Sequence, residues 1–238
     1  MEKFSLYDLL AVLFPGVIFL YMLNIIREIF SIFPNYELTD SWELLLVMAI
    51  VTGGVIYVIS FLLTSRLKWL YKISEMYQHI SGLYQKADIH DTIGTVLNKR
   101  ANEWYGNDIF FSQSDYNQLP ESQKDEVCKL QDNFYDRMYY ELDYAGKLTT
   151  PKSFQSFYLF FRNVFVATAI SIFVLLMLYL VNLIPPFHFS TPDCGDTIIS
   201  SIAFIFIFFC SNVIARWYRK RTIQKMYWFF YTHINLKQ

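Results

Sequence analysis

Residues 163–184 read NVFVATAISIFVLLMLYLVNLI and contain no Asp, Glu, Lys or Arg. A helix needs roughly 20 mostly apolar residues to cross the hydrocarbon core of a bilayer. Three other runs share this composition, at Leu9–Ile26, Leu44–Ser65 and Thr197–Ala215. The sequence therefore predicts an all-α membrane protein with four transmembrane helices, at about 9–26, 44–65, 163–184 and 197–215.

These predicted spans form two transmembrane hairpins, residues 1–65 and 163–215, which flank a charged insert at 66–162. A basic and aromatic helix is predicted to follow at 216–238. The stretch Asp40-Ser41-Trp42-Glu43 has the spacing of a capping box, so the second span is predicted to begin there. The fold class is thus two hairpins of transmembrane helices around a helical insert.

The insert itself is predicted to be mainly helical. Apolar residues recur every three or four positions over 67–85, as they would if the second span continued as an amphipathic helix. Residues 101–118 are rich in Asn, Asp and Ser and are predicted to form a loop, with a helix at 98–105. Two more helices are predicted, one after Pro120 that ends near Gly146 and one that runs from Thr150-Pro151 through the third span to about Leu183.

The Lys and Arg residues beside the spans predict how the chain lies in the membrane. They gather after the second span, before the third and after the fourth, at Arg66, Lys68, Lys72, Lys152, Arg162, Arg216, Arg219, Lys220, Arg221 and Lys225. The first outer loop has only Arg27, and the loop at 185–196 has neither Lys nor Arg. The positive-inside rule therefore predicts that both termini and the insert lie in the cytoplasm.

The segment 216–231 alternates basic and aromatic residues, and this pattern has two interpretations. It is typical of an interfacial helix held on anionic lipid. This is the interpretation that the pattern favours, and the alternative is a stem that packs against the insert or against a neighbouring subunit.

Several residues within the predicted spans are candidates for a hinge or a pore lining. Pro15 and Gly16 interrupt the first span, and Gly53 with Gly54 leaves room for a second helix to approach. Thr52 and Asn212 represent the hydroxyl and amide groups that could line a water-filled path. The other interpretation is an ordinary kink for Pro15 and Gly16, and hydrogen bonding between helices for the polar groups.

The best candidate for ligand recognition is the stretch that contains Lys99, Arg100, Trp104 and Tyr105. Two cations with two aromatic rings could hold a phosphate and stack a base. The alternative is a solvated helix face whose rings pack inward. The chain carries no phosphate-binding glycine loop and no hydrolase or zinc-protease motif, and its three cysteines form no CxxC pair. We therefore predict no enzyme activity, no metal site and no cofactor.

The opening Tyr7-Asp8-Leu9-Leu10, followed by Phe14-Pro15-Gly16, resembles the start of small membrane proteins from bacterial phage-defence operons. The layout of two hairpins around a helical insert is similar to the oligomeric channel effectors of those operons, such as the Hailong channel effectors. This resemblance implies an oligomeric pore in the bacterial inner membrane. It also implies a cytoplasmic part that senses a nucleotide or oligonucleotide signal and an opening that depolarises the infected cell.

Two hypotheses for the function follow. In the first, the chain is a homo-oligomeric channel or pore effector gated by its cytoplasmic insert, through a nucleotide signal or a cytoplasmic sensor protein. In the second, it is a non-conducting anchor or accessory subunit that tethers a cytoplasmic partner. In both, the lipid bilayer is a partner of the chain.

Overall fold

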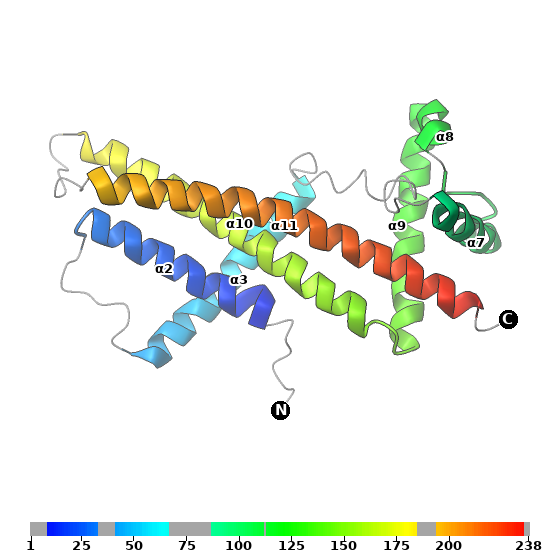
Figure 1. Ribbon diagram of the computed structural model, residues 1–238, viewed down its shortest axis with the longest axis horizontal. Coiled ribbons are helices and arrows are strands. Elements are labelled where there is room, and N and C mark those ends of the chain that lie inside the picture. Colours follow the sequence, from blue (N-terminus) through cyan, green and yellow to red (C-terminus); the bar gives the residue numbers. More distant parts are fainter. Residues whose placement is uncertain (1–8, 33–40, 67–86, 112, 185–193, 236–238) are drawn as a thin grey trace. The chain divides into compact units, whose positions relative to one another are not determined.

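The computed structural model describes residues 9–32, 41–66, 87–111, 113–184 and 194–235, and in these parts the chain is helical (Figure 1). A short π-helix, η1, is followed by seven α-helices. Their bounds are η1 (Leu9–Leu13), α2 (Phe14–Ile29), α3 (Trp42–Arg66), α7 (Ala87–Tyr105), α8 (Gln113–Gln118), α9 (Glu121–Tyr144), α10 (Thr149–Asn182) and α11 (Cys194–Asn235).

Four segments of these helices are long and apolar enough to cross a membrane. They are Leu9–Ile29, Trp42–Thr64, Thr149–Asn182 and Gly195–Asn235. Helices α7, α8 and α9 lie between the second and the third of them in the chain. The prediction of an all-α protein with four spans and an inserted helical part is therefore confirmed, and the chain is a multi-pass helical membrane protein.

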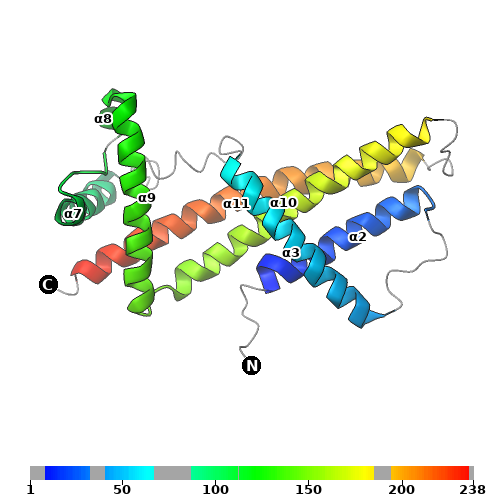
Figure 2. The same ribbon diagram turned by 180° about the vertical axis from the view of Figure 1, so that it is seen from behind.

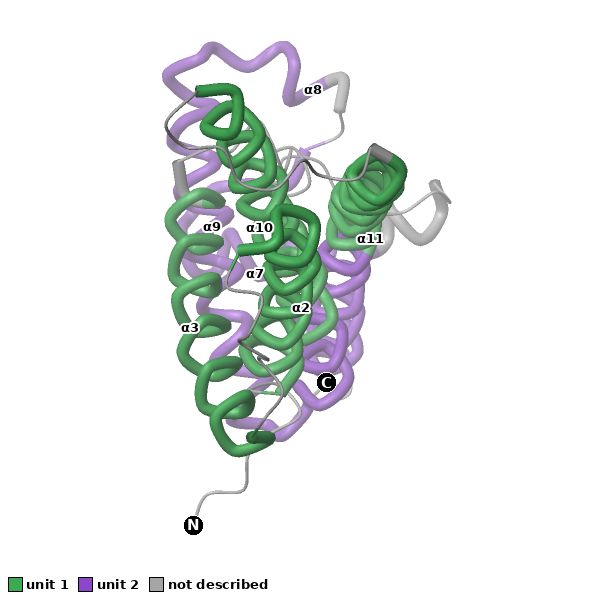
Figure 3. Tube along the Cα trace, turned by 90° about the vertical axis from the view of Figure 1, so that its left-hand side faces the viewer, with its two compact units in different colours: residues 1–66, 156–217 green, residues 67–155, 218–238 purple. Residues whose placement is uncertain are grey.

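The chain divides into two compact units, which are coloured separately in Figure 3. We call residues 1–66 and 156–217 the membrane unit, and residues 67–155 and 218–238 the insert unit. Two helices have residues in both units, since α10 begins at Thr149 and α11 ends at Asn235. The insert and the last part of the chain thus belong to one unit.

The ends of the first two spans are set by local hydrogen bonds. At the start of α3, the backbone N–H of Leu44 donates to the hydroxyl of Ser41 at 3.4 Å, which makes Ser41 the N-cap and confirms the predicted start of this helix. At the end of α2, the N–H of Ile32 donates to the carbonyl of Arg27 at 3.0 Å. This closing turn places Ser31 in the left-handed region, with φ of 48°, where glycine is usual.

The core of the membrane unit is formed by α2, α10 and α11. Met22, Ile26 and Phe30 are buried in one cluster with Leu175 of α10 and Phe204 of α11. The rings of Phe165 and Phe208 stack with their centroids 4.4 Å apart. Figures 1 and 2 show α2 running beside these two helices while α3 crosses it.

Much of the apolar surface of the spans is not covered by the chain itself. Exposed large side chains follow one another along α3 and α11, at Val47, Val51, Val55, Val58, Phe61, Ile198, Ile202, Phe206, Phe209 and Val213. Such a surface suits the acyl chains of lipid or another membrane helix.

The insert unit has a core of its own, drawn from α7, α9 and the last part of α11. Every third or fourth residue of these helices is buried in it: Ile93, Leu97, Ala101, Phe134, Met138, Leu142, Ile223, Met226, Tyr227 and Phe230. The tail helix is therefore a stem that packs against the insert, as one of the two interpretations predicted. The interfacial interpretation is wrong for this face, because it is buried against protein.

The prediction for 101–118 is confirmed in part. The helix predicted at 98–105 is the last part of α7, which ends at Tyr105, but α8 occupies Gln113–Gln118, where a loop was predicted. Ala101 is buried in the core of the insert unit, and this burial offsets the weak helix propensity of the polar residues around it. Gly146 ends α9 as predicted, with φ of +67°, and α10 begins at Thr149, close to the predicted Thr150-Pro151 start. The helix predicted at 67–85 lies outside the described residues.

Candidate functional site

The first two spans meet at two glycines. A Cβ atom on Gly16 would lie 1.9 Å from the carbonyl oxygen of Ala49, and one on Gly53 would lie 2.0 Å from that of Val12. Such distances are far below any van der Waals contact, so only glycine fits at either position. Gly16 and Gly53, both predicted as hinge or pore residues, thus form the close contact between the opening of the first span and α3.

The other predicted hinge or pore residues of the spans, Gly54, Thr52 and Asn212, show no hydrogen bond to a second helix in the described chain. A Cβ atom on Gly54 would meet nothing within 4 Å. The Thr52 hydroxyl donates to the carbonyl of Met48 in its own helix at 2.7 Å. The Asn212 side-chain oxygen accepts a hydrogen bond from Nε of Arg216, one turn later, at 3.2 Å. In the described chain these groups bond within their own helices and not across to another one.

Pro15 creates the irregularity from which the rest of the site is built. It is the second residue of α2, which follows the π-helix η1 directly. A proline has no backbone N–H, so it cannot donate to the carbonyl of Ala11, four residues earlier. The side-chain Nδ2 of Asn163, on α10, donates to this carbonyl instead, at 2.5 Å. The predicted interruption of the first span is thus a turn whose freed carbonyl is satisfied by the third span.

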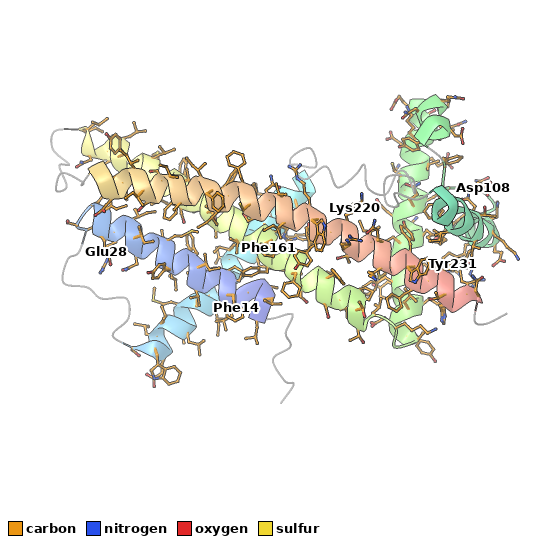
Figure 4. All side chains as sticks on the ribbon, in the orientation of Figure 1. Phe14, Glu28, Asp108, Phe161, Lys220 and Tyr231 are labelled. Atoms are coloured by element: carbon orange, nitrogen blue, oxygen red, sulfur yellow. The ribbon has the colours of Figure 1, made fainter. Side chains whose placement is uncertain are left out.

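Arg162 lies beside this contact and is almost fully buried. Only 4% of it is exposed, and Asn163 is completely buried. Nε and Nη2 of Arg162 each contact Oδ1 of Asn163 at 3.4 Å. The guanidinium lies 5.4 Å from the ring centroid of Tyr57 on α3 and 5.7 Å from that of Tyr158 on α10. In Figure 4, Phe161 and Phe14, which neighbour this site, lie at the end of α2 that is far from Glu28.

We call Ala11, Pro15, Tyr57, Arg162 and Asn163 the Arg162 site. From its place in the sequence, Arg162 was interpreted only as a charge that flanks the third span, and Tyr57 and Asn163 were not predicted as site residues. The one available signal was an arginine followed by an amide at the very start of an apolar run. Ionisable and amide groups that are buried at or within a membrane span are costly, and they commonly carry function.

In the insert unit, the predicted ligand residues come together only in part. The Trp104 ring is 5.1 Å from the guanidinium of Arg100 and 4.2 Å from that of Arg137, which the sequence analysis missed. Its centroid is 5.0 Å from that of Phe134. Because these groups already contact the indole, a nucleobase would have to displace one of them to stack on Trp104.

The remaining ligand candidates lie around this cluster. Lys99 is exposed on α7, and the ring of Tyr105 meets that of Trp104 edge to face at 6.3 Å. Burial raises the pKa of the Tyr105 hydroxyl above its usual value, although the nearby Arg137 guanidinium acts in the opposite direction. The Tyr105 hydroxyl is therefore neutral at physiological pH and can both donate and accept a hydrogen bond.

Acidic residues balance much of the charge near Trp104. Arg100 contacts Glu103 at 2.6 Å and Glu141 at 3.7 Å. Glu141 also lies 3.6 Å from Nε2 of the buried His233 on α11. The contact between Arg100 and Glu141 joins α7 to α9, so Arg100 has a structural role here.

No cluster of His, Cys, Asp and Glu that could hold a metal ion occurs within the described residues. Comparison of the chain with protein-family models, with curated proteins and with solved structures found no match. Within the described residues, we take the Arg162 site as the candidate site because a buried cation and a buried amide lie there beside the irregular first turn of a span.

Proposed function

We propose that the chain is the subunit of a homo-oligomeric membrane channel whose opening is controlled by its insert unit. The resemblance to phage-defence effectors adds the bacterial inner membrane as the place, with the termini in the cytoplasm, and depolarisation of an infected cell as the outcome. A nucleotide or oligonucleotide signal, or a cytoplasmic sensor protein, would act on the insert unit.

One observation carries this proposal, the hydrogen bond from Asn163 to the Ala11 carbonyl. Asn163 belongs to α10, whose first turn lies in the insert unit. A shift or rotation of α10 moves this amide relative to η1, and the Ala11 carbonyl then loses its donor. The contact therefore links α10, a helix that has residues in both units, to the first span. A ligand drives such a change only if it binds one of the two arrangements more tightly.

The surface of α3 and α11 supports assembly into an oligomer. Only 22% of the apolar segment of α3 and 17% of that of α11 are buried within the chain. A pore between subunits needs such uncovered helices, and it needs no charged lining if its gate is hydrophobic.

The experiment uses the full chain reconstituted into liposomes, with its mass measured under native conditions and ion flux followed by a fluorescent indicator. We expect a homo-oligomer and a basal flux that rises several-fold in Asn163→Leu. The matched control is Asn24→Leu, because the Asn24 amide bonds only Glu28 of its own helix, at 2.8 Å. A monomeric wild type, or the same flux in both variants as in the wild type, contradicts the proposal.

A second candidate is the non-conducting anchor, and the surface of α9 favours it. Tyr140 is 71% exposed and Tyr144, one turn later, is 97% exposed. Two exposed tyrosines on one helical face are typical of a contact with another protein. The anchor is supported over the channel by two results together. The wild-type chain passes no ions, and it is recovered with one stoichiometric partner that is lost in Tyr140→Ala and Tyr144→Ala.

A further inference from the structure

The charge of Arg162 is not balanced by the part of the chain that the structure describes. Three other basic residues there pair with acids: Arg100 with Glu103, Lys124 with Glu121 at 2.9 Å, and Lys152 with Asp143 at 2.7 Å. The described residues provide Arg162 with no carboxylate within 4.0 Å, although it is among the most buried basic residues of the chain.

The contacts that Arg162 does make are too weak to offset its burial. Its two bonds to Asn163 are long, at 3.4 Å, and the two tyrosine rings contribute about 0.5–2 kcal/mol each. Removing a charged group from water costs several kcal/mol even after the protein relaxes. A guanidinium does not avoid this cost by losing its proton. An anion near Arg162 would offset the cost that these contacts leave.

The position of Arg162 indicates which anion is available. The charge-free run of the third span begins at the next residue, Asn163, and we infer from this that the guanidinium lies near the boundary between hydrocarbon and headgroups. Tyr57, on α3, is only partly buried and borders the same site. The planar fork of a guanidinium matches two oxygens of a phosphate, and a tyrosine hydroxyl can donate to a third.

We propose that Arg162 is the centre of a phosphate-binding site and that an anionic phospholipid provides the phosphate. The lipid headgroup would neutralise the guanidinium and hold α10 against α3 and η1. This inference does not depend on the chain being a channel, since a structural lipid would serve an anchor equally well.

The experiment measures the midpoint of thermal unfolding of the full chain in a neutral detergent, with three additions. These are phosphatidylglycerol, phosphatidylcholine and inorganic phosphate. The variants are Arg162→Gln and the control Arg27→Gln, because Arg27 also lies in the membrane unit but has a carboxylate, Glu28, at 3.8 Å.

We expect phosphatidylglycerol to raise the midpoint of the wild type and of Arg27→Gln equally, by several degrees. In Arg162→Gln this lipid should bind about tenfold more weakly, as expected for the loss of a charge-assisted hydrogen bond. An undiminished shift in Arg162→Gln overturns the proposal. If inorganic phosphate raises the midpoint as much as phosphatidylglycerol does, and this rise also depends on Arg162, then the lipid is not the source of the phosphate.

A second variant covers the case in which Arg162→Gln does not fold. Arg162→Lys keeps the charge but loses the planar fork, so phosphatidylglycerol should stabilise it less than it stabilises the wild type. Native mass spectrometry then counts the retained lipids. The same number of phosphatidylglycerol molecules on Arg162→Lys and on the wild type, with equal shifts of the midpoint, contradicts a phosphate site at this residue.

Discussion

Gly16 and Gly53 bring the backbones of the first two spans into direct contact. A Cβ atom on Gly16 would come within 3.0 Å of the backbone nitrogen of Gly53, and still closer to the carbonyl oxygen of Ala49. Small residues allow such close approach between membrane helices, where dispersion forces and backbone contacts provide the stabilisation.

The Gly53→Ala variant should therefore lower the stability of the membrane unit. The added methyl group forces α3 away from η1, and overpacking of this kind costs about 1–3 kcal/mol. The adjacent Gly54→Ala is the matched control, since its Cβ atom meets nothing within 4 Å. Thermal unfolding in detergent should show a lower midpoint for the first variant alone. Equal midpoints for the two variants would contradict the close contact.

Asn163 and Pro15 should be energetically coupled. Asn163→Leu leaves the Ala11 carbonyl without its donor, at a cost of about 1–3 kcal/mol. Pro15→Ala restores a backbone N–H that can reach this carbonyl within its own helix. The loss caused by Asn163→Leu should therefore be smaller in the Pro15→Ala background, and a double-mutant cycle of unfolding free energies measures the difference. Strict additivity would show that Pro15 does not free the carbonyl.

Ser31 ends α2 with φ of 48°, a conformation that is costly for any residue with a side chain. Ser31→Gly should raise the free energy of unfolding by up to about 1 kcal/mol, because glycine adopts this conformation without strain. Ser31→Val should lower it, since a β-branched side chain fits this region poorly. A stabilising Ser31→Val, measured in the same detergent, would be incompatible with the left-handed turn.

Tyr116 should make the insert unit sensitive to alkali. Burial raises the pKa of its hydroxyl, and the contact with Sγ of Cys128 at 3.5 Å acts in the same direction. A group whose pKa is raised on folding favours the folded state below its unfolded value, here about 10. This contribution is lost as the pH rises through the folded value.

The unfolding free energy should accordingly fall above about pH 10, and Tyr116→Phe should fall less steeply. Chemical unfolding of the full chain at pH 9, 10 and 11 checks this, together with the absorbance of tyrosinate. If the unfolding free energies of the wild type and of Tyr116→Phe fall in parallel with pH, the folded surroundings of Tyr116 do not raise the pKa of its hydroxyl.

The sequence was sufficient for features that depend on residues close together in the chain. The four spans follow from uninterrupted apolar runs, and the ends of two helices follow from Ser41 and Gly146, whose side chains or backbone act within one turn. The stem at 223–230 was only half predictable, because alternating basic and aromatic residues favour a lipid interface and also suit a protein core.

The contacts of the candidate site join distant residues, and for this reason they could not be predicted. Asn163 and Ala11 are separated by 152 positions, and no periodic pattern links an amide in one span to a carbonyl in another. Arg137 is on α9, far in sequence from Trp104 on α7, so the pair of cations at that indole was likewise invisible. Arg162 was visible as a charge, but its burial depends on Tyr57 and Tyr158 around it.

The core of the insert unit has a consequence for the biogenesis of the chain. Phe134 and Met138 share that core with Ile223 and Phe230, which a ribosome adds only after the third span and the first part of α11 have been made. Until then, the faces of α7 and α9 that carry these residues have no partner from α11. The core of the insert unit can therefore close only after the third span and most of α11 have been translated, and an arrested chain that ends before Ile223 should be bound by chaperones.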